Sequence, residues 1–414
     1  MSTPLHAFAG YGIELEYMIV DRHTLSVLPV ADELLRRMAG SRTSELRMGG
    51  LALSNELVMH LIELKNTGPE SALALKSLSS SFQAEIRHVN KILEPLNARL
   101  MPTAMHPWMN PSAETRLWPH DNTAIYRAYD RIFDCKRHGW ANLQSMHLNL
   151  PFAGDNEFAR LHAAIRLVLP ILPALAASSP FAEGRNSGFL DYRMENYRTH
   201  QARVASTIGQ VIPATAMSCA GYDSQVMQPM YREIAALDPE SVLHHEWLNV
   251  RGAAPRFERS AIEIRVIDVQ ECPLADFAIA AAVANLVGTL YDARWTPFAE
   301  QQEIGTDALA GIMLACIRDA DQADIANAAY LRLLGLPDRR CKAGELWQHL
   351  VETMSWGYLD QRSEWQEPLD VILRSGPLAR RILRATGTAC DRSRLEDVYR
   401  QLCDCLAEGR MFHG

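Results

Sequence analysis

Alternation marks the stretch Gly12-Ile13-Glu14-Leu15-Glu16-Tyr17-Met18-Ile19-Val20. Its odd-numbered residues are apolar or aromatic and two of its even-numbered residues are glutamates, which predicts a β-strand with one face in a core. Residues two apart on a strand share a face, so Glu14 and Glu16 point the same way, roughly 7 Å apart. Like charges at that separation repel unless a cation bridges them or water screens them. The stretch is therefore either one wall of a cation site or an edge strand with a solvated acidic face.

A second acidic segment contains Glu63 within an apolar run, where an ionised carboxylate needs a partner. We expect a strand over Leu57–Leu64. A spacing of seven puts two residues of one strand on opposite faces, so Glu56 would lie in a turn before the strand and reach round to Glu63. A helix would also bring the two together. Pairing of Glu63 with Lys65 or an arginine is the structural alternative to a metal site.

A third segment, Asn142–Leu150, alternates as a strand with Ser145, His147 and Asn149 on one face. One histidine on a strand is more often a packed or surface group than a ligand, because histidine is common in both places. The meaning of His147 therefore depends on which residues the fold places beside it.

A fourth segment, Ala261–Asp268, is an apolar strand on which Glu263 and Arg265 share a face. Ile262, Ile264 and Val266 face the core in this interpretation. A glutamate–arginine pair is commonly structural, but it also supplies a carboxylate for a divalent cation and a guanidinium for developing phosphate charge. Carboxylate ligands without cysteine suit magnesium or manganese better than zinc.

Composition excludes several classes of protein. The 414 residues carry a net charge of −8, with 48% hydrophobic and 22% charged residues, which excludes disorder, collagen and coiled coil and gives no sign of nucleic-acid binding. No lysine follows a P-loop frame, and Leu15 replaces the third glycine that a dinucleotide motif after Gly10 would need.

The eight cysteines form no metal-binding spacing, so we expect reduced thiols. The most apolar stretch, Leu161–Ser179, contains Arg166 and two prolines, so we expect a soluble, cytoplasmic protein without membrane partners.

Helical periodicity lies mainly between and after these strands. It predicts helices at 72–96, 160–177, 274–291, 307–334, 343–356, 369–385 and 394–407. The strands are far apart in sequence, which favours an α+β fold whose sheet is assembled from distant segments.

The four strand segments together resemble the glutamate–cysteine ligase type 2 family, which belongs to the glutamine synthetase-like superfamily. His106-Pro107-Trp108 is similar to the family's His-Pro-Phe element, and Ala176–Gly184 with Gly188 and Tyr192-Arg193 is similar to its Ala-Ser-Ser-Pro-Phe block. Glu263-Ile264-Arg265 with Asp268 is similar to its Glu-x-Arg-x-x-Asp strand. The resemblance covers about residues 10–295. Ser260-Ala261 departs from the Gly-Thr of the family, and Trp108 from its phenylalanine.

The resemblance implies a curved antiparallel sheet with helices on its convex side. It implies a catalytic ligase domain over residues 1–295 and a helical segment over 296–414 packed on the same domain. By this resemblance Arg265 contacts the transferring phosphoryl group with Glu263 beside it, and Arg193, or alternatively Arg198, holds the substrate carboxylate. The implied metal ligands are Glu14, Glu16, Glu56, Glu63, His147 and Glu263.

The implied activity is an ATP-dependent carboxylate–amine ligase that forms an amide of the γ-glutamyl type through an acyl phosphate, with ATP and Mg²⁺ or Mn²⁺. Its small-molecule partners would be an amino acid carboxylate and an amine. The resemblance does not decide whether the chain forms a homo-oligomer. A phosphotransferase of the same superfamily, a ligase with another amine acceptor, and a non-catalytic protein on the same fold are the alternatives.

Overall fold

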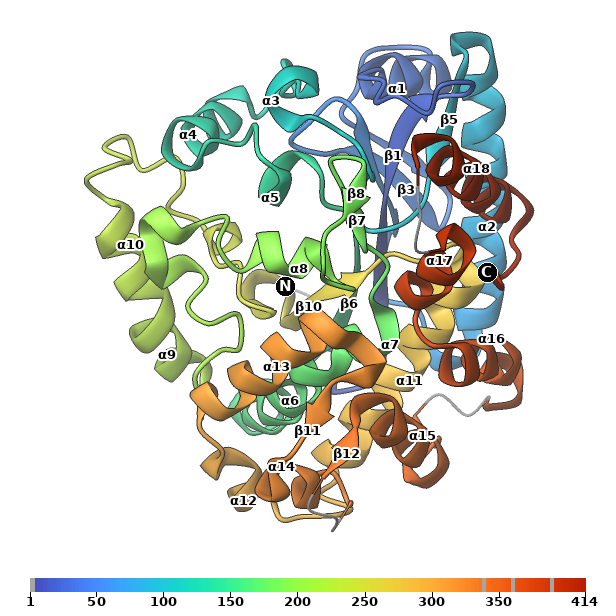
Figure 1. The fold of residues 1–414 in the computed structure, drawn as a ribbon. Coiled ribbons are helices and arrows are strands. Elements are labelled where there is room, and N and C mark those ends of the chain that lie inside the picture. Colours follow the sequence, from blue (N-terminus) through green and yellow to red (C-terminus); the bar gives the residue numbers. More distant parts are fainter. Residues whose placement is uncertain (1–3, 337–339, 359–361, 388–390) are drawn as a thin grey trace.

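A single large sheet forms the centre of the molecule (Figure 1). The structure is a computed structural model that describes residues 4–336, 340–358, 362–387 and 391–414. The sheet has eight strands in the order β2-β3-β4-β1-β6-β10-β9, with β5 also paired to β1, and every neighbouring pair is antiparallel. The strands are β1 Gly12–Asp21, β2 Glu45–Met48, β3 Leu51–Asn55, β4 Leu61–Asn66, β5 Ala98–Met101, β6 Ser145–Pro151, β9 Ala253–Arg256 and β10 Ala261–Asp268. The mixed fold with an antiparallel sheet matches the predicted class.

Strand β1 lies at the middle of this sheet and has neighbours on both edges. One edge pairs with β4, and the other is divided between β6, along Gly12–Leu15, and β5, along Met18–Asp21. Its odd-numbered side chains Ile13, Leu15, Tyr17 and Ile19 are fully buried in the large core, as the alternation predicts. We call this the back face of the sheet and the face that carries Glu14 and Glu16 the front face.

The back face shares its core with long helices. Helix α11 is apolar on all sides and buried over nearly its whole length, and it packs against α2, α6 and α16. It begins directly after Cys272, and Pro273 takes the first helical position, where a missing N–H costs nothing. The helices of the fold are α1 Ala31–Ala39, α2 Leu75–Leu93, α3 Pro111–Glu114, α4 Thr123–Phe133, α5 His138–Ala141, α6 Gly154–Val168, α7 Leu172–Ala176, α8 Tyr192–Tyr197, α9 Cys219–Tyr222, α10 Gln228–Ile234, α11 Pro273–Tyr291, α12 Phe298–Glu303, α13 Thr306–Asp319, α14 Ala328–Leu333, α15 Ala343–Thr353, α16 Arg362–Ser375, α17 Leu378–Thr386 and α18 Arg392–Glu408.

The C-terminal helices divide between two cores. Residues of α13, α14 and α15 join the large core, where the Trp347 indole N–H donates to the carbonyl of Ile171. Helices α17 and α18 instead cover a second cluster on the front face, built around Met18, Val20 and Leu61. In Figure 1 α17 and α18 lie at the right of the view, as α2 does, whereas α3–α5 and α8–α10 lie at the left; α18 contacts both α2 and β5.

Several segments differ from the expected elements. Residues 57–60 form the connection between β3 and β4 instead of the start of a strand. The expected helix at 307–334 is divided into α13 and α14 by a short strand, β11 (Asp324–Ile325), that pairs with β12 (Cys341–Lys342). The expected helix at 369–385 is divided into α16 and α17 near Pro377, since the residue before a proline disfavours helical geometry. A further hairpin, β7 Phe181–Ala182 and β8 Arg185–Asn186, lies in a region without an expected element.

Two helical stretches, Gly154–Ala176 and Pro273–Tyr291, are long and apolar enough to cross a membrane by length and composition. Their most apolar windows are 94% and 89% buried inside the fold, as core helices of globular proteins are. Length and hydropathy alone therefore do not indicate a membrane span here. The seven cysteines within the described ranges form no disulfide bond with one another, and Cys390 lies outside those ranges.

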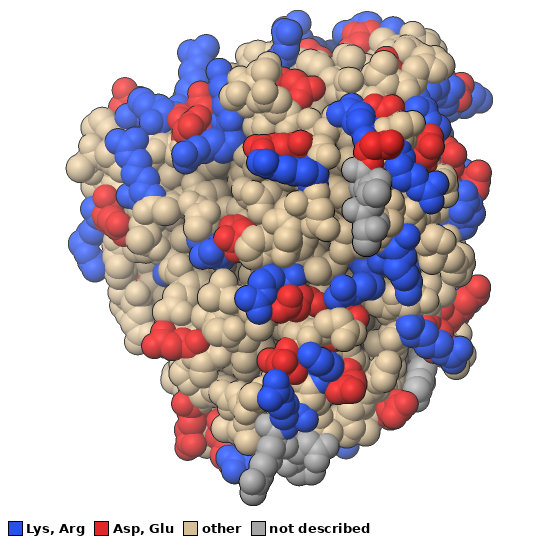
Figure 2. All heavy atoms as spheres, viewed as in Figure 1, with Lys and Arg blue, Asp and Glu red and all other residues tan. Residues whose placement is uncertain are grey.

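The surface mixes charges of both signs. Figure 2 shows basic and acidic side chains interspersed over the visible face, and those drawn in colour form no broad field of one sign there. Many charged side chains of the protein are paired, as Arg318 is with Asp319 and Arg380 is with Asp321.

Candidate active site

The front face of four adjacent strands gathers the predicted acidic residues. In the register of the sheet, Glu16 on β1 stands directly opposite Glu63 on β4. Glu14 stands between Lys65 on β4 and His147 on β6. Opposite residues of antiparallel strands have Cβ atoms about 5 Å apart, so their side chains are forced into contact. The sheet therefore places carboxylates beside one another that are up to 49 residues apart in the chain (63 − 14).

A hairpin explains how Glu56 joins this group. Ser54 on β3 pairs with Glu63 on β4, and the Ser54 hydroxyl lies 3.2 Å from Glu63 Oε1. Glu56 follows Ser54 by two residues and continues on the same side as the chain leaves β3. Glu63 therefore lies on β4 and Glu56 in the connection just past the end of β3, so Glu56 reaches round to Glu63 as predicted and the odd spacing does not separate them.

The carboxylates form two groups that could each hold a metal ion. Glu14, Glu63 and His147 form one group and Glu16, Glu56 and Glu63 form the other, and within each the ligand atoms lie within 4.8 Å of one another. Glu63 belongs to both. A set of carboxylate oxygens with one imidazole nitrogen is the kind of ligand set that magnesium or manganese binds. Five of the six predicted ligands thus fit a divalent cation site.

The pKa values in this group show the effect of several carboxylates lying close together. Burial and the charge of Glu14 raise the pKa of Glu63 to about 7, although Lys65 opposes this. Burial together with Glu63 and Glu16 raises the pKa of Glu56 well above its ordinary value. Burial would also raise the pKa of Glu14, but the hydrogen bond and charge of His147 outweigh it and the pKa is lowered. The group therefore holds more negative charge than the protein itself neutralises.

His147 connects the two groups. Its Nδ1 lies 3.1 Å from Glu14 Oε2, and its Nε2 lies 2.9 Å from Ser145 Oγ. Both the hydroxyl and the main-chain N–H of Ser145 donate to Glu16, at 2.8 and 2.7 Å. Burial would lower the pKa of His147, but its acidic neighbours outweigh this and the pKa is raised. His147 is thus a member of the acidic group rather than an isolated packed histidine.

Glu263, the sixth predicted ligand, lies in neither group. Arg256 on β9 grips it with a fork, Nε to Oε2 at 2.9 Å and Nη2 to Oε1 at 3.0 Å, and Arg265 Nε lies 3.1 Å from Oε1. These cations hold the pKa of Glu263 far below its usual range against the effect of burial. Glu263 still faces the same site, since its charge acts on Glu14.

A β-bulge aims Arg265. Between the paired residues Ile264–Leu148 and Ile267–Met146, strand β10 has two residues where β6 has only His147. An extra residue of this kind kinks the strand and re-aims its side chains. Arg265 therefore faces His147 and the acidic group, and Asp268 returns to the front face opposite Ser145, which strict alternation from Arg265 would not give.

The two arginines predicted for the substrate carboxylate lie in different surroundings. Arg193 at the start of α8 is almost fully buried, with Nη1 3.3 Å from Asp268 and Nη2 donating to the main-chain oxygen of Arg265 at 2.8 Å. Arg198 is bound by both oxygens of Glu195 at 2.7 Å on the same helix. Of the two, Arg193 lines the cavity beside the acidic group.

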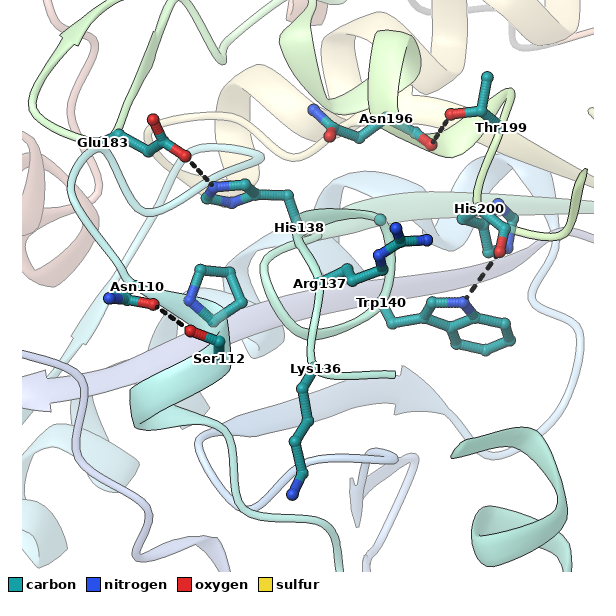
Figure 3. Close-up of a pocket in the computed structure, with 12 residues that line it drawn as sticks. Asn110, Ser112, Lys136, Arg137, His138, Trp140, Glu183, Asn196, Thr199 and His200 are labelled. Carbon is teal, nitrogen blue, oxygen red and sulfur yellow. Dashed lines mark hydrogen bonds and ion pairs between the residues drawn. The ribbon is translucent and has the colours of Figure 1, made fainter. Parts of the chain in front are cut away.

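That central cavity measures about 130 Å³ and receives Glu16, Glu56, His147, Arg193 and Arg265. It adjoins a wider cavity of about 460 Å³, since Gly139, Trp140 and His200 line both. Figure 3 shows the wider cavity, in which His138 and Glu183 face one another and the Trp140 indole points to the backbone of His200. Its other lining residues are mostly polar or basic, among them Asn110, Ser112, Lys136, Arg137, Asn196 and Thr199.

A third cavity of about 470 Å³ lies on the other side of the acidic group. Glu14, Lys65 and Asn149 form its boundary with the group, and Arg47 and Arg259 line it further out. Apolar and polar surfaces contribute similarly to it, with Leu5, Pro69 and Pro151 among the apolar residues. The acidic group thus lies between two separate approaches from solvent.

Sequence reasoning missed several residues of this site. The sequence indicates only a structural pairing of Lys65 with Glu63, yet Lys65 borders a cavity. Arg256 lies on β9, an edge strand that contains Pro255. Because proline has no N–H to donate to a neighbouring strand, its presence argues against predicting a strand there. Trp140 and His200 come from loops and short helices, which leave no periodic signal.

The fold resembles those of known ligases. A bifunctional glutathione synthetase from Pasteurella multocida superimposes with a TM-score of 0.58 at 14% identity, over 97% of this chain and 52% of that one. A glutamate–cysteine ligase from Francisella tularensis, solved in complex with AMP, superimposes with a TM-score of 0.56 at 15% identity, over 96% and 88% of the two chains. This chain therefore shares its fold with these two proteins.

A family profile and sequence relatives identify the family of this chain. The profile of glutamate–cysteine ligase family 2 matches residues 11–401, and the chain belongs to that family. The match extends through the C-terminal helices, beyond the range of about 10–295 in which the motifs lie. An uncharacterised protein of Archaeoglobus fulgidus is 32% identical over 350 residues, 83% of this chain and 92% of that protein. A Rubrobacter xylanophilus protein provisionally named glutamate–cysteine ligase 2-3 is 29% identical over 47% of this chain and half of its own length.

Proposed function

We propose that this chain is an ATP-dependent ligase that joins a carboxylate to an amine through an acyl phosphate, in the manner of a glutamate–cysteine ligase. The observation that carries the proposal is the pair of acidic groups that share Glu63, placed between two cavities and faced by Arg265. Membership of glutamate–cysteine ligase family 2 and the fold shared with two ligases support the same reaction class.

In this proposal the acidic group holds divalent cations through Glu14, Glu16, Glu56, Glu63 and His147. Bound Mg²⁺ or Mn²⁺ would neutralise the polyphosphate, which otherwise repels an incoming carboxylate. Glu263 remains a candidate ligand that Arg256 and Arg265 hold in place. We assign ATP to the cavity bordered by Glu14 and Lys65, whose apolar residues suit a base and whose arginines suit phosphates.

The substrates then approach from the opposite side. The carboxylate substrate lies in the central cavity, beside Arg193, and attacks the γ-phosphate to give ADP and an acyl phosphate. Arg265, which faces this cavity, stabilises the charge that grows on the transferring phosphoryl group. An amine that enters through the wider cavity beyond Trp140 displaces phosphate to form the amide. Positioning and electrostatics carry the reaction without a covalent enzyme intermediate.

An ADP-release screen tests this function. Glutamate is combined with cysteine, other amino acids and simple amines, and the mass of each product is determined. We expect ADP release that requires both the acid and an amine, stops after exhaustive chelation, and returns with Mg²⁺ or Mn²⁺ more than with Zn²⁺. ADP release that needs no amine would identify a phosphotransferase instead. Absence of ATP turnover with every pair would contradict the proposal.

A further inference from the structure

Lys65 occupies a position that neither the acidic group nor the proposed reaction explains. It is one of only five lysines in the chain. Its Nζ lies 2.6 Å from Glu63 Oε1, 3.1 Å from Ser54 Oγ and 3.6 Å from Glu45. The register of the sheet also places it directly opposite Glu14. A cation thus lies against the one carboxylate that both candidate metal groups share.

The same side chain borders the cavity on the Glu14 side. Lys65 lines that cavity with Asn149, Arg47 and Arg259, and about a quarter of its side chain is exposed. Arg47 is 74% exposed and pairs with Glu45 near the cavity mouth. Of the three cationic residues that line the cavity, Lys65 is the one whose side chain contacts the acidic group at the inner end of the cavity within the described residues. A ligand that reached from the cavity to the acidic group would pass its ammonium.

We propose that Lys65 is a phosphate-binding residue that Glu63 holds in place until nucleotide arrives. The proposal rests on the proposed function, because it requires that the cavity takes a nucleoside triphosphate. Phosphates bound by cations on the acidic group must lie next to Glu63, and so next to Lys65. Glu63 would share its negative charge with a divalent cation bound there, and the ammonium of Lys65 would then donate to phosphate oxygens instead.

This role predicts effects of opposite sign on two ligands. Lys65→Met removes a competitor for Glu63, so Mn²⁺ without nucleotide should bind severalfold more tightly. The same change removes a charged donor to phosphate, so a non-hydrolysable ATP analogue with Mg²⁺ should bind about tenfold more weakly. AMP, which lacks the β- and γ-phosphates, should lose little affinity. Loss of folded protein would weaken all three ligands together.

The experiment measures these affinities by calorimetry for wild type, Lys65→Met, Lys65→Arg and Lys76→Met. Lys76 also pairs with a glutamate, Glu364, but borders none of these cavities, so its variant is the matched control and should bind like wild type. Lys65→Arg keeps the charge and should retain most of the affinity for the ATP analogue. Lys65→Gln, which can still hydrogen bond to Ser54 and Glu63, provides the same comparison if the methionine variant does not fold.

Two results would overturn the proposal about Lys65 alone. One is wild-type affinity for the ATP analogue in Lys65→Met and Lys65→Gln, and the other is an equal loss for AMP and the analogue, which would indicate a change of cavity shape. If wild type bound neither nucleotide, the proposed function would fail as well. The nucleotide affinity of wild type therefore separates the two proposals.

Discussion

The front face of β1 changes character at its midpoint, and its two halves serve different purposes. Glu14 and Glu16 lie in the half that pairs with β6 and form the acidic group. Met18 and Val20 follow on the same face, in the half that pairs with β5, and are fully buried beneath α17 and α18. One strand therefore supplies the floor of the candidate site and the anchor of the C-terminal helices. Charge occurs on this face only where neighbouring strands supply partners for it.

The largest effect should follow from Arg265→Ala in the polar half. Arg265 faces the central cavity, and losing one donor to transition-state charge typically costs about 4 kcal/mol, or roughly a thousandfold in turnover. Glu263 keeps its fork from Arg256, so the fold should survive. ADP release per folded molecule and melting temperature, measured on the same preparation, check this. Arg374→Ala, which breaks only a surface pair with Asp370, is the control. Normal turnover in Arg265→Ala would remove the central residue of the mechanism.

The apolar half should respond through stability instead. Met18→Glu continues the acidic alternation by one step, but places the carboxylate under α17 and α18 without a cationic partner in that cluster. An unpaired buried charge costs about 3 kcal/mol or more. Denaturant unfolding should show this loss, whereas Met18→Leu, with nearly the same volume, should cost less than about 1.5 kcal/mol. Equal stability of Met18→Glu and wild type would show that the two halves do not differ as we describe.

Much of this comparison was predictable from the sequence, because strand alternation is a local property. The buried odd-numbered residues of β1 and the shared face of Glu263 and Arg265 follow from period two. The resemblance to the family supplied the metal ligands, and the sheet brings five of those six together. Neither alternation nor motif indicated that Met18 and Val20 lie under the C-terminal helices, because that contact joins residues far apart in the chain.

The features that the sequence did not predict depend on strand register and on irregular backbone. The connection at 56–60 could not be distinguished from strand, since Leu57, Val58 and Met59 are as apolar as the strand that follows. The bulge at Arg265 shifts Asp268 to the front face, and no residue pattern marks it. The sequence did not indicate that Asp268 and a main-chain oxygen contact the terminal nitrogens of Arg193. These features are decided by pairing between strands and loops rather than by local propensity.

A histidine in the back-face core provides a pH test of the rule that a buried charge needs a partner. His162 on α6 is fully buried, stacks on Phe158, and is the histidine whose two ring nitrogens both lack a partner within the described part of the chain. Burial, reinforced by Arg166, lowers its pKa from 6.5 to about 3.

The sign follows from that lowered pKa. Above pH 6.5 the imidazole is neutral in both states, and below it only the unfolded state takes up the proton. Stability should therefore fall as the pH drops from about 6.5 toward 3, by up to about 1.4 kcal/mol per pH unit from this residue. His162→Leu should make unfolding free energy less dependent on pH in this window and leave it similar above pH 7. Parallel pH profiles for the two proteins would show that His162 is protonated in the folded state.

The smallest effect should be a gain of stability in the polar half. Glu56 is crowded by Glu63 and Glu16, and its raised pKa means that the ionised form is disfavoured in the folded protein. For a carboxyl with a raised folded pKa, stability is lost as the pH rises above the unfolded value of 4.5.

Glu56→Gln removes the charge but keeps the shape, so without divalent cations at pH 7 it should be more stable than wild type by about 1 kcal/mol. The difference should vanish below pH 4.5, where Glu56 is protonated in both states, and should shrink when Mg²⁺ stabilises wild type more than the variant. The same substitution should lower ADP release, because a carboxylate of the acidic group is lost. A variant that is less stable than wild type at pH 7 without metal would show that Glu56 contributes to the fold, and the contrast between the two halves of β1 would then no longer reflect a cost of function.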